Sequence, residues 1–200
     1  MLKKMIYPKT KRLSNNNKWL ITEKVDGSNL TIFKYNGELC IAQRNWIFKA
    51  SELDEFKDKL YGGLYGWVQG FKDDLVNNLH EGSAIIGEWL GMSKGDYKKS
   101  FDHRFLIFAK ANVNNKLDLY NIIYDPECFK YPFIGQSIPP YIGVVPILDC
   151  RDIKPSVDEL DVLYANYKPN RYVEGFVVSN GTVALKYVRM KSGELEEHHE

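Results

Sequence analysis

The stretch EKVDGSN, residues 23–29, decides how this sequence is interpreted. It joins two runs that are rich in β-branched and aromatic side chains, residues 19–26 and 30–35, and its Asp, Gly, Ser and Asn residues favour tight turns. The pattern predicts a strand, a turn and a second strand, arranged as a hairpin. Lys24 would then stand on a rigid strand beside the turn, with its amine aimed at whatever binds there.

Lys24 has the placement that a nucleophilic lysine needs. An amine attacks only in its neutral form, which burial and neighbouring cations favour. The four-residue pattern Lys-x-Asp-Gly is short enough to occur by chance, and a surface lysine beside a turn is the ordinary interpretation. The chemistry therefore depends on what the rest of the chain supplies.

Working outward, two Asn-Gly pairs predict further hairpins. Asn36-Gly37 precedes a β-rich run at residues 39–43, and Asn180-Gly181 separates the runs 172–179 and 182–188. Residues 84–90 and 105–109 are apolar runs of strand length. The sequence thus predicts antiparallel sheets.

Helices are expected between these strands. Residues 51–60 form a charged segment, and Val68, Phe71, Leu75 and Leu79 recur at helical spacing. The stretch Ser-Val-Asp-Glu at residues 156–159 is a capping box ahead of a third helix, and residues 132–146 are a proline-rich connector. We therefore expect a single α+β domain over residues 1–200, with antiparallel β-sheets flanked by helices.

The charges of the sequence nearly balance. Lysine and arginine total 27 against 26 aspartate and glutamate, so any surface for nucleic acid must be local. Two groups of basic residues mixed with aromatic ones are candidates for such a surface: Lys3, Lys4, Lys9, Lys11 and Arg12, and then Lys94, Lys98 and Lys99.

The sequence has no pattern typical of disulfide-rich, zinc-binding or membrane-spanning proteins. Cys40, Cys128 and Cys150 are widely spaced, and none of the four histidines has ligand spacing to them, so neither a disulfide framework nor a zinc site is predicted. No apolar run follows the charged residues near Met1, and no run anywhere reaches the roughly 18 apolar residues of a membrane span, so we expect a cytoplasmic protein without membrane contact.

Five motifs in order resemble those of the covalent nucleotidyltransferases, the superfamily of ATP-dependent DNA ligases, RNA ligases and messenger-RNA capping enzymes. The first is Lys24 to Gly27, and its longer form, EKxxGSN, is similar to the RNA ligase 2 group. In that group a histidine commonly takes the place of Asp26, so this residue is more like the DNA ligases. The resemblance implies a nucleotidyltransferase fold, similar to ATP-grasp, in which Lys24 carries AMP.

The other motifs imply a role for each matching residue. Arg44 would lie near the phosphate and ribose, Glu88 in GEWLG would bind the ribose hydroxyls, and Phe108 in FLIFA would stack on the purine. Glu174 in EGFVV would help to hold a divalent metal, and Lys186 in VALK would contact the α-phosphate. Catalysis is thus expected from Lys24, Lys186, Glu174 and Arg44, and nucleotide binding from Glu23, Lys24, Asn29, Arg44, Glu88, Phe108, Lys186 and Lys191.

Some of these assignments have ordinary alternatives. Glu88 could be a strand-end carboxylate paired with a lysine, and Phe108 could belong to the core, with Phe105 as the competing choice for stacking. Gly175 after Glu174 could mark a bulge, or could let a ligand approach the backbone. The last motif usually has a second lysine two residues after the first, where Val188 stands here, and the candidates to replace it are Arg189 and Lys191.

The resemblance implies an ATP-dependent RNA ligase that uses Mg²⁺ or Mn²⁺. Such an enzyme transfers AMP from ATP to Lys24, then to a 5′-phosphate, and finally joins that end to a 3′-hydroxyl with release of AMP. The chain leaves no room for the C-terminal OB barrel or helical domain of relatives, so an accessory protein could supply contacts to the RNA. A DNA ligase, with DNA as the substrate, is the alternative that Asp26 favours. A GTP-dependent capping enzyme is disfavoured by the missing barrel. A non-catalytic module that binds a nucleotide or RNA is the alternative that the retained Lys24 disfavours.

Overall fold

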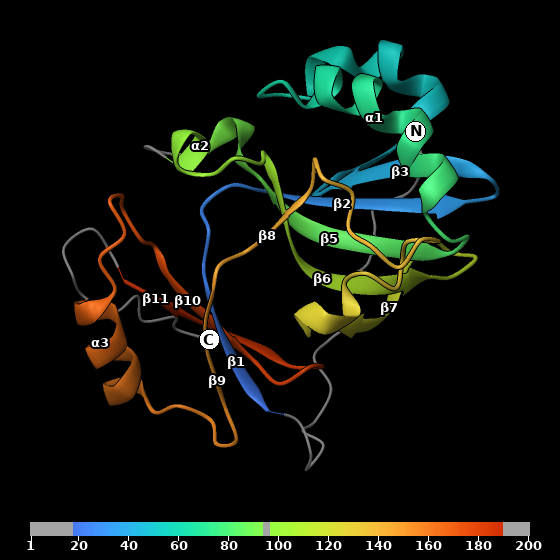
Figure 1. Cartoon of the computed structure of the whole chain (residues 1–200). Coiled ribbons are helices and arrows are strands. Elements are labelled where there is room, and N and C mark those ends of the chain that lie inside the picture. Colours follow the sequence, from blue (N-terminus) through green and yellow to red (C-terminus); the bar gives the residue numbers. More distant parts are fainter. Residues whose placement is uncertain (1–17, 94–96, 190–200) are drawn as a thin grey trace.

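Two antiparallel sheets form the framework of the protein. The computed structural model describes residues 18–93 and 97–189. The smaller sheet has the order β11-β10-β1-β9, from strands β1 (Trp19–Glu23), β9 (Ile147–Arg151), β10 (Gly175–Ser179) and β11 (Ala184–Val188). The larger sheet has the order β4-β3-β2-β5-β6-β7, from β2 (Ser28–Tyr35), β3 (Glu38–Gln43), β4 (Trp46–Lys49), β5 (Ser83–Trp89), β6 (Phe105–Val113) and β7 (Leu119–Ile123). A short strand, β8 (Gly143–Val144), pairs in parallel with β6 and runs between the two sheets (Figure 1).

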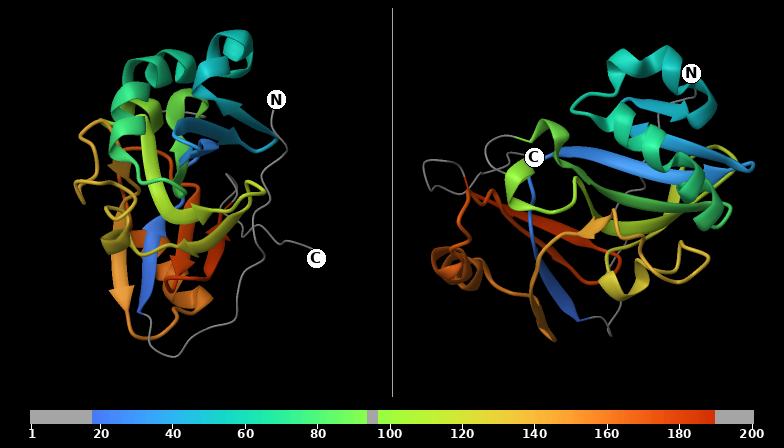
Figure 2. Two further views of the ribbon diagram at one scale, coloured as in Figure 1. Left: turned by 90° about the vertical axis from the view of Figure 1, so that its right-hand side faces the viewer. Right: turned by 45° about the horizontal axis from the view of Figure 1, so that its top comes forward.

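Helices cover the outer faces, which confirms the expected α+β class. The 3-10 helix η1 (Ala50–Lys59) and α1 (Leu64–Asn78) lie over one face of the larger sheet, whereas α3 (Val157–Asn166) lies against the smaller sheet (Figures 1 and 2). The remaining helical pieces are η2 (Leu90–Met92), α2 (Tyr97–Ser100) and η3 (Pro126–Cys128). No helix in the two described ranges is long and apolar enough to cross a membrane.

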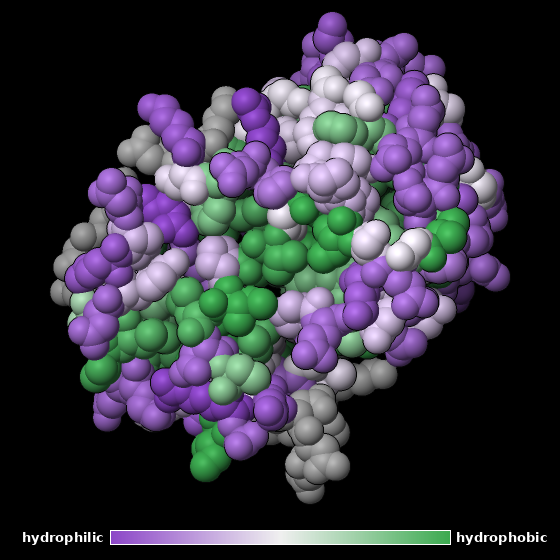
Figure 3. Space-filling model, in the orientation of Figure 1, coloured by the Kyte–Doolittle hydropathy of each residue, from purple (hydrophilic) through white to green (hydrophobic). Residues whose placement is uncertain are grey.

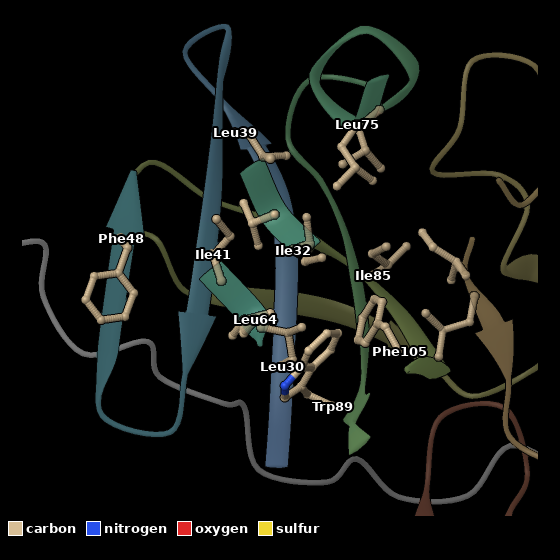
Figure 4. Close-up of a cluster of buried hydrophobic side chains, with 14 of the residues drawn as sticks. Leu30, Ile32, Leu39, Ile41, Phe48, Leu64, Leu75, Ile85, Trp89 and Phe105 are labelled. Atoms are coloured by element: carbon tan, nitrogen blue, oxygen red, sulfur yellow. The ribbon is translucent and has the colours of Figure 1, made fainter. Parts of the chain in front are cut away.

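The largest hydrophobic cluster lies between α1 and the larger sheet. Leu30 and Ile32 alternate along β2 toward this face and pack with Leu64 of α1 and with Trp89 (Figure 4). Phe33 points to the opposite face and belongs to a second cluster, so β2 is buried on both sides. Burial on both faces explains why apolar residues stand at adjacent positions, Ile32 and Phe33, in the middle of the strand. The larger sheet is therefore a rigid base for the residues at its ends.

The hairpin expected around EKVDGSN is not formed, and this prediction was wrong. β1 pairs with β10 and β9, while β2 pairs with β3 and β5, so residues 24–27 carry the chain from one sheet to the other. Local turn residues predict a change of direction, but the partners of a strand are decided by long-range packing. Gly27 permits this crossing, because a Cβ there would lie 2.8 Å from the carbonyl oxygen of Trp89.

The other local predictions are confirmed with shifted ends. Asn36 and Gly37 have φ of 52° and 74° in the β2–β3 hairpin, and Gly181 has φ of 85° between β10 and β11. The capping box of Ser156 and Glu159 begins α3. Residues 50–59 are a 3-10 helix, β10 starts at Gly175, and the connector at 132–146 contains β8.

Polar side chains cover the outer parts of the face seen in Figure 1. Apolar side chains gather at the centre of this face, around the place where β8 passes between the sheets (Figure 3). The region between the sheets is therefore the place where a ligand with an apolar surface can be held.

Candidate functional site

A cavity of about 300 Å³ lies between the two sheets. Lys24 at the end of β1 and Lys186 of β11 line it from the smaller sheet, and Glu88 of β5 and Phe108 of β6 line it from the larger sheet. Residues that are more than 150 positions apart in the sequence thus meet in one space. The structure brings together four of the residues that the motifs singled out.

Strand alternation explains why the two lysines share a face. Thr22, Val177 and Lys186 are direct cross-strand neighbours, and the amide of Lys24 donates to the carbonyl of Gly175 two residues further along. Thr22 and Lys24 are two residues apart, so their side chains lie on the same side of the sheet. This register directs both lysine side chains into the cavity.

Lys24 forms an ion pair with Glu174. The amine nitrogen Nζ lies 2.5 Å from Oε2 of the carboxylate, and the two side chains are 28% and 24% exposed. The backbone N–H of Glu174 donates a hydrogen bond of 3.1 Å to the hydroxyl of Tyr97, which is buried. Glu174 is therefore held in place beside the amine by α2.

Glu88 lies in a region with excess negative charge. Burial raises the pKa of Glu88 to about 7; the charge of Lys24 opposes this rise, and the charges of Glu174 and Asp26 add to it. Glu88 therefore interacts with two other carboxylates and with one amine, and a bound cation would relieve part of that negative charge. Glu88 pairs with Asn29 across the strands, so its position is fixed by the larger sheet.

The structure distinguishes Phe108 from Phe105. Phe105 is fully buried in the cluster under α1, whereas Phe108 is partly exposed and lines the cavity. Ile86 pairs with Ala109 and Gly87 with Ile107, so Phe108 is the extra residue of a β-bulge. Phe105 and Ile107 belong to the cluster under α1, so alternation places Phe108 on the opposite face of β6, toward the cavity, and the bulge brings the next residue, Ala109, to that face as well.

Glu23 is among the residues that line the cavity, but its carboxylate is bound by Tyr167 and Arg171, which do not line it. Its side chain is fully buried, accepts a 2.7 Å hydrogen bond from the hydroxyl of Tyr167 and forms an ion pair with Arg171. Burial raises the pKa of Glu23, while the Tyr167 hydrogen bond and Arg171 lower it. The guanidinium of Arg171 also lies over the ring of Tyr97, 5.7 Å from its centroid. One network behind the sheet therefore supports Lys24 through Glu23, and Glu174 through Tyr97.

Arg44 and Asn29 line a second cavity of about 900 Å³, which shares Glu88 with the first one. Arg44 lies in the turn between β3 and β4 and is exposed. Neither residue lines the first cavity. The motif residues are thus divided between two adjoining spaces.

Other candidates lie outside the site or outside the described residues. Arg189 forms an ion pair with Asp161 of α3, on the outer side of the smaller sheet. Lys191, the basic residues at positions 3–12 and Lys94 lie outside the described residues, as does the side chain of Lys98, while Lys99 is exposed.

The glycine after Glu174 is required by the fold and not by a ligand. A Cβ at Gly175 would lie 2.0 Å from the carbonyl oxygen of Tyr187, and its φ is 154°. The neighbouring strand β11, and not an open space, occupies the volume beside this glycine. β10 and β11 pair here without a register shift, so Gly175 does not mark a bulge, and it instead allows the close approach of the neighbouring strand.

Sequence reasoning missed the supporting network of Arg171, Tyr167 and Tyr97. Arg171 lies only three residues before Glu174, but none of the three residues belongs to a motif, and no local pattern marks them. The one available signal was the carboxylate of Glu23, which stands in an apolar strand next to Lys24. A charge that is buried requires a partner, so a cationic or hydrogen-bonding partner could have been expected.

The described residues contain no group of three or more His, Cys, Asp or Glu side chains arranged to hold a metal ion. A cation such as Mg²⁺ does not require such a group, because it binds through one or two carboxylates together with waters and phosphates. Glu174, with Glu88 and Asp26 nearby, has the oxygen donors that such a cation prefers.

Comparisons with known proteins agree with this geometry. A family model described as RNA ligase matches residues 17–188. The fold is similar to that of a Naegleria gruberi RNA ligase mutant with ATP and Mn, with a TM-score of 0.55, 17% identity and coverage of 92% of this chain and 56% of that chain. A second mutant of that ligase, in the apo form, matches with a TM-score of 0.53 and 15% identity, covering 92% of this chain and 55% of that chain. A third mutant, with ATP and Mn, matches with a TM-score of 0.52 and 19% identity, covering 87% of this chain and 50% of that chain. This chain therefore spans little more than half the length of those ligases. None of the curated proteins matches this sequence.

Proposed function

The chain belongs to the RNA ligase family, and from this premise we propose that it is an ATP-dependent RNA ligase that forms a covalent lysyl-AMP intermediate on Lys24. The single observation that supports the proposal best is the shared cavity of Lys24, Lys186, Glu88 and Phe108, with Glu174 bound to the amine of Lys24. A nucleotide placed there would meet an amine, cationic and anionic side chains and an aromatic ring. We propose that the substrates are RNA ends that carry a 5′-phosphate and a 3′-hydroxyl.

In the first step the amine of Lys24 attacks the α-phosphorus of ATP. A P–N bond forms, the bond to the β-phosphate oxygen breaks, and pyrophosphate leaves. A protonated amine has no lone pair, so Lys24 must lose a proton before the attack, and Glu174, whose Oε2 lies 2.5 Å from the amine, would accept it. Lys186 on the same face of the sheet would stabilise the negative charge that develops on the phosphate oxygens.

The other side chains would position the nucleotide. Phe108 offers its ring to the purine, and Glu88 offers carboxylate oxygens to the ribose hydroxyls from the opposite wall. Arg44 would reach the nucleotide from the second cavity. Because attack on phosphorus depends on alignment and charge, positioning of this kind is the main contribution of the protein.

Glu174, together with Glu88 or Asp26, would hold a divalent cation, Mg²⁺ or Mn²⁺. When bound, such a cation would neutralise charge on the triphosphate. The Naegleria ligase structures with ATP and Mn agree with this assignment of ATP and a divalent metal as cofactors.

The later steps would use the same residues. A 5′-phosphate oxygen attacks the AMP phosphorus, the P–N bond breaks, and Lys24 recovers its amine. The 3′-hydroxyl then attacks the 5′-phosphate and AMP leaves. We place this reaction in the cytoplasm, and we propose that an accessory protein contributes contacts to RNA, because a chain with a net charge of +1 attracts a polyanion weakly.

A sealing assay tests the function. Nicked duplexes with a labelled 5′-phosphate are incubated with ATP and Mg²⁺, with RNA or DNA on the 3′-hydroxyl side. We expect sealing of RNA by the wild type, none by Lys24→Ala, and normal sealing by Lys116→Ala, which changes an exposed lysine outside the site. Preferential sealing of DNA would identify a DNA ligase. Nucleotide binding without sealing or labelling by the wild type would identify a non-catalytic module.

A further inference from the structure

The second cavity is larger than a nucleotide's phosphates need and has a different lining from the first. Its volume is about 900 Å³, and its walls come from the start of β2, the β3–β4 turn and the end of η1. Glu88 belongs to both cavities, so the two spaces adjoin at this carboxylate. A ligand in the second cavity would therefore lie beside a nucleotide in the first.

Aromatic and cationic side chains alternate along one wall of this cavity. The amine of Lys59 lies over the ring of Trp46, 4.1 Å from its centroid, and Arg44 is exposed beside them. Tyr61 follows Lys59 by two residues and is 61% exposed. Rings that accept a base and cations that accept phosphate are the two elements of binding sites for single-stranded nucleic acid.

Packing does not explain Tyr61. Trp46 contacts the cluster under α1, and its ring contributes to the core, but Tyr61 leaves most of its surface in solvent. A site for the pyrophosphate of ATP would need cationic side chains but no aromatic ones, because phosphate has no flat surface that stacks on a ring. The combination of an exposed tyrosine, a lysine held over tryptophan and an arginine therefore favours a ligand with both a base and a phosphate.

We propose that the second cavity binds the end nucleotide of the RNA strand that carries the 5′-phosphate, with its base against Tyr61 and its phosphates facing Lys59. This inference rests on the proposed function, because it assigns a binding site to the RNA 5′-phosphate that accepts AMP from Lys24. The shared wall at Glu88 would bring the 5′-phosphate next to the AMP on Lys24. A 5′-phosphate oxygen could then form the new P–O bond while the P–N bond to Lys24 breaks.

Two variants test the site. Tyr61→Ala removes the exposed ring, and Lys59→Gln removes one charge. Their matched controls are Tyr131→Ala and Lys130→Gln, because Tyr131 is 49% exposed with the amine of Lys130 lying 5.6 Å from its ring centroid, and neither residue lines the cavity. The probe is a short fluorescent single-stranded RNA with a 5′-phosphate, and binding is measured by anisotropy over a range of salt concentrations. Labelling of Lys24 by ATP is measured in the same samples.

The two variants are expected to weaken binding in different ways. Tyr61→Ala should raise the Kd for RNA about fivefold or more at every salt concentration, because stacking contributes about 1–3 kcal/mol per base. Lys59→Gln should reduce the slope of log K against log salt by about 0.7, the value for one phosphate contact on a single strand. The control variants should bind as the wild type does, and labelling of Lys24 should stay unchanged in all four.

The outcomes separate this inference from the proposed function. Unchanged RNA binding in both Tyr61→Ala and Lys59→Gln would overturn the inference, as would equal losses in the control variants. Loss of ATP labelling with normal RNA binding would instead assign the cavity to the phosphates of ATP. A wild type that binds RNA through Tyr61 and Lys59 but is never labelled would refute the proposed ligase and leave the RNA site in place.

Discussion

The substitution Arg171→Met should be strongly destabilising, and its cost should depend on pH. Arg171 and Glu23 are 8% and 0% exposed, so the variant would leave a carboxylate buried without its cationic partner. Breaking a buried ion pair in this way costs about 3–5 kcal/mol. For a chain of this size, one kcal/mol corresponds to about 2–4 °C in Tm, so the expected loss is about 6–20 °C.

The pH dependence follows from Glu23. Burial raises its pKa, and Arg171 is one of the two groups that lower it, so the pKa should rise further in the variant. A carboxyl whose pKa is raised by folding adds stability below its unfolded pKa, and this stability is lost as the pH rises through the folded pKa. The cost of Arg171→Met should therefore be smaller at about pH 5 than at about pH 8, because a raised pKa favours the neutral carboxyl at the lower pH.

Urea or thermal unfolding at these two pH values measures the effect. Arg151→Met is the matched control, because Arg151 is 33% exposed and pairs with exposed carboxylates, where an ion pair contributes about 0–1 kcal/mol. Adding Glu23→Gln to Arg171→Met should recover part of the lost stability at about pH 8, since the buried charge is then gone. If Arg171→Met costs no more than Arg151→Met, or costs the same at both pH values, the assignment of this network is refuted.

Three further predictions concern the cavity. Glu88→Ala should weaken ATP binding about tenfold to 100-fold and remove any preference for ATP over 2′-deoxy-ATP in labelling assays, since a hydrogen bond to a charged group contributes about 1.5–3 kcal/mol; a retained preference would exclude the ribose role. Phe108→Ala should raise the Kd for ATP about fivefold or more through lost stacking, while the fold stays intact. Phe105→Ala truncates a core residue, so it should lower the free energy of unfolding by about 3–5 kcal/mol. Equal losses of stability in the two variants would place both rings in the core. Gly27→Ala should reduce labelling of Lys24 sharply, because its Cβ would lie 2.8 Å from a backbone oxygen. The control Gly66→Ala, with no atom within 4 Å of the added Cβ, should stabilise α1 by about 0.5–1 kcal/mol. Normal labelling of Gly27→Ala would show that the chain between β1 and β2 does not require a glycine at this position.

Local patterns in the sequence predicted the elements but not all of their partners. The Asn-Gly hairpins and the capping box of Ser156 depend on neighbours within a few residues, so their sequence patterns were sufficient. The path from β1 to β2 depends on β10, which is about 150 residues further along, and no local pattern reports it. The wrong hairpin at EKVDGSN shows the limit of turn residues as evidence.

The candidate site shows the same division. Motif order placed Lys24, Glu88, Phe108 and Lys186 together, and the structure brings them into one cavity. Alternation places Phe105 and Phe108 on opposite faces of β6, but the sequence does not show which face meets the cavity, so the choice of Phe108 needed the packing of Phe105 under α1. The separation of Arg44 into a second cavity, and the support of Lys24 by Arg171, arise from the packing of distant segments.

Mass spectrometry of the protein after incubation with ATP and Mg²⁺ tests the central claim most directly. The account predicts one AMP on the peptide that contains Lys24, joined through an acid-labile P–N bond, with release of pyrophosphate. The adduct should be absent from Lys24→Ala and present in Lys116→Ala. An adduct on another residue, or one that persists in Lys24→Ala, would contradict the claim that Lys24 is the nucleophile.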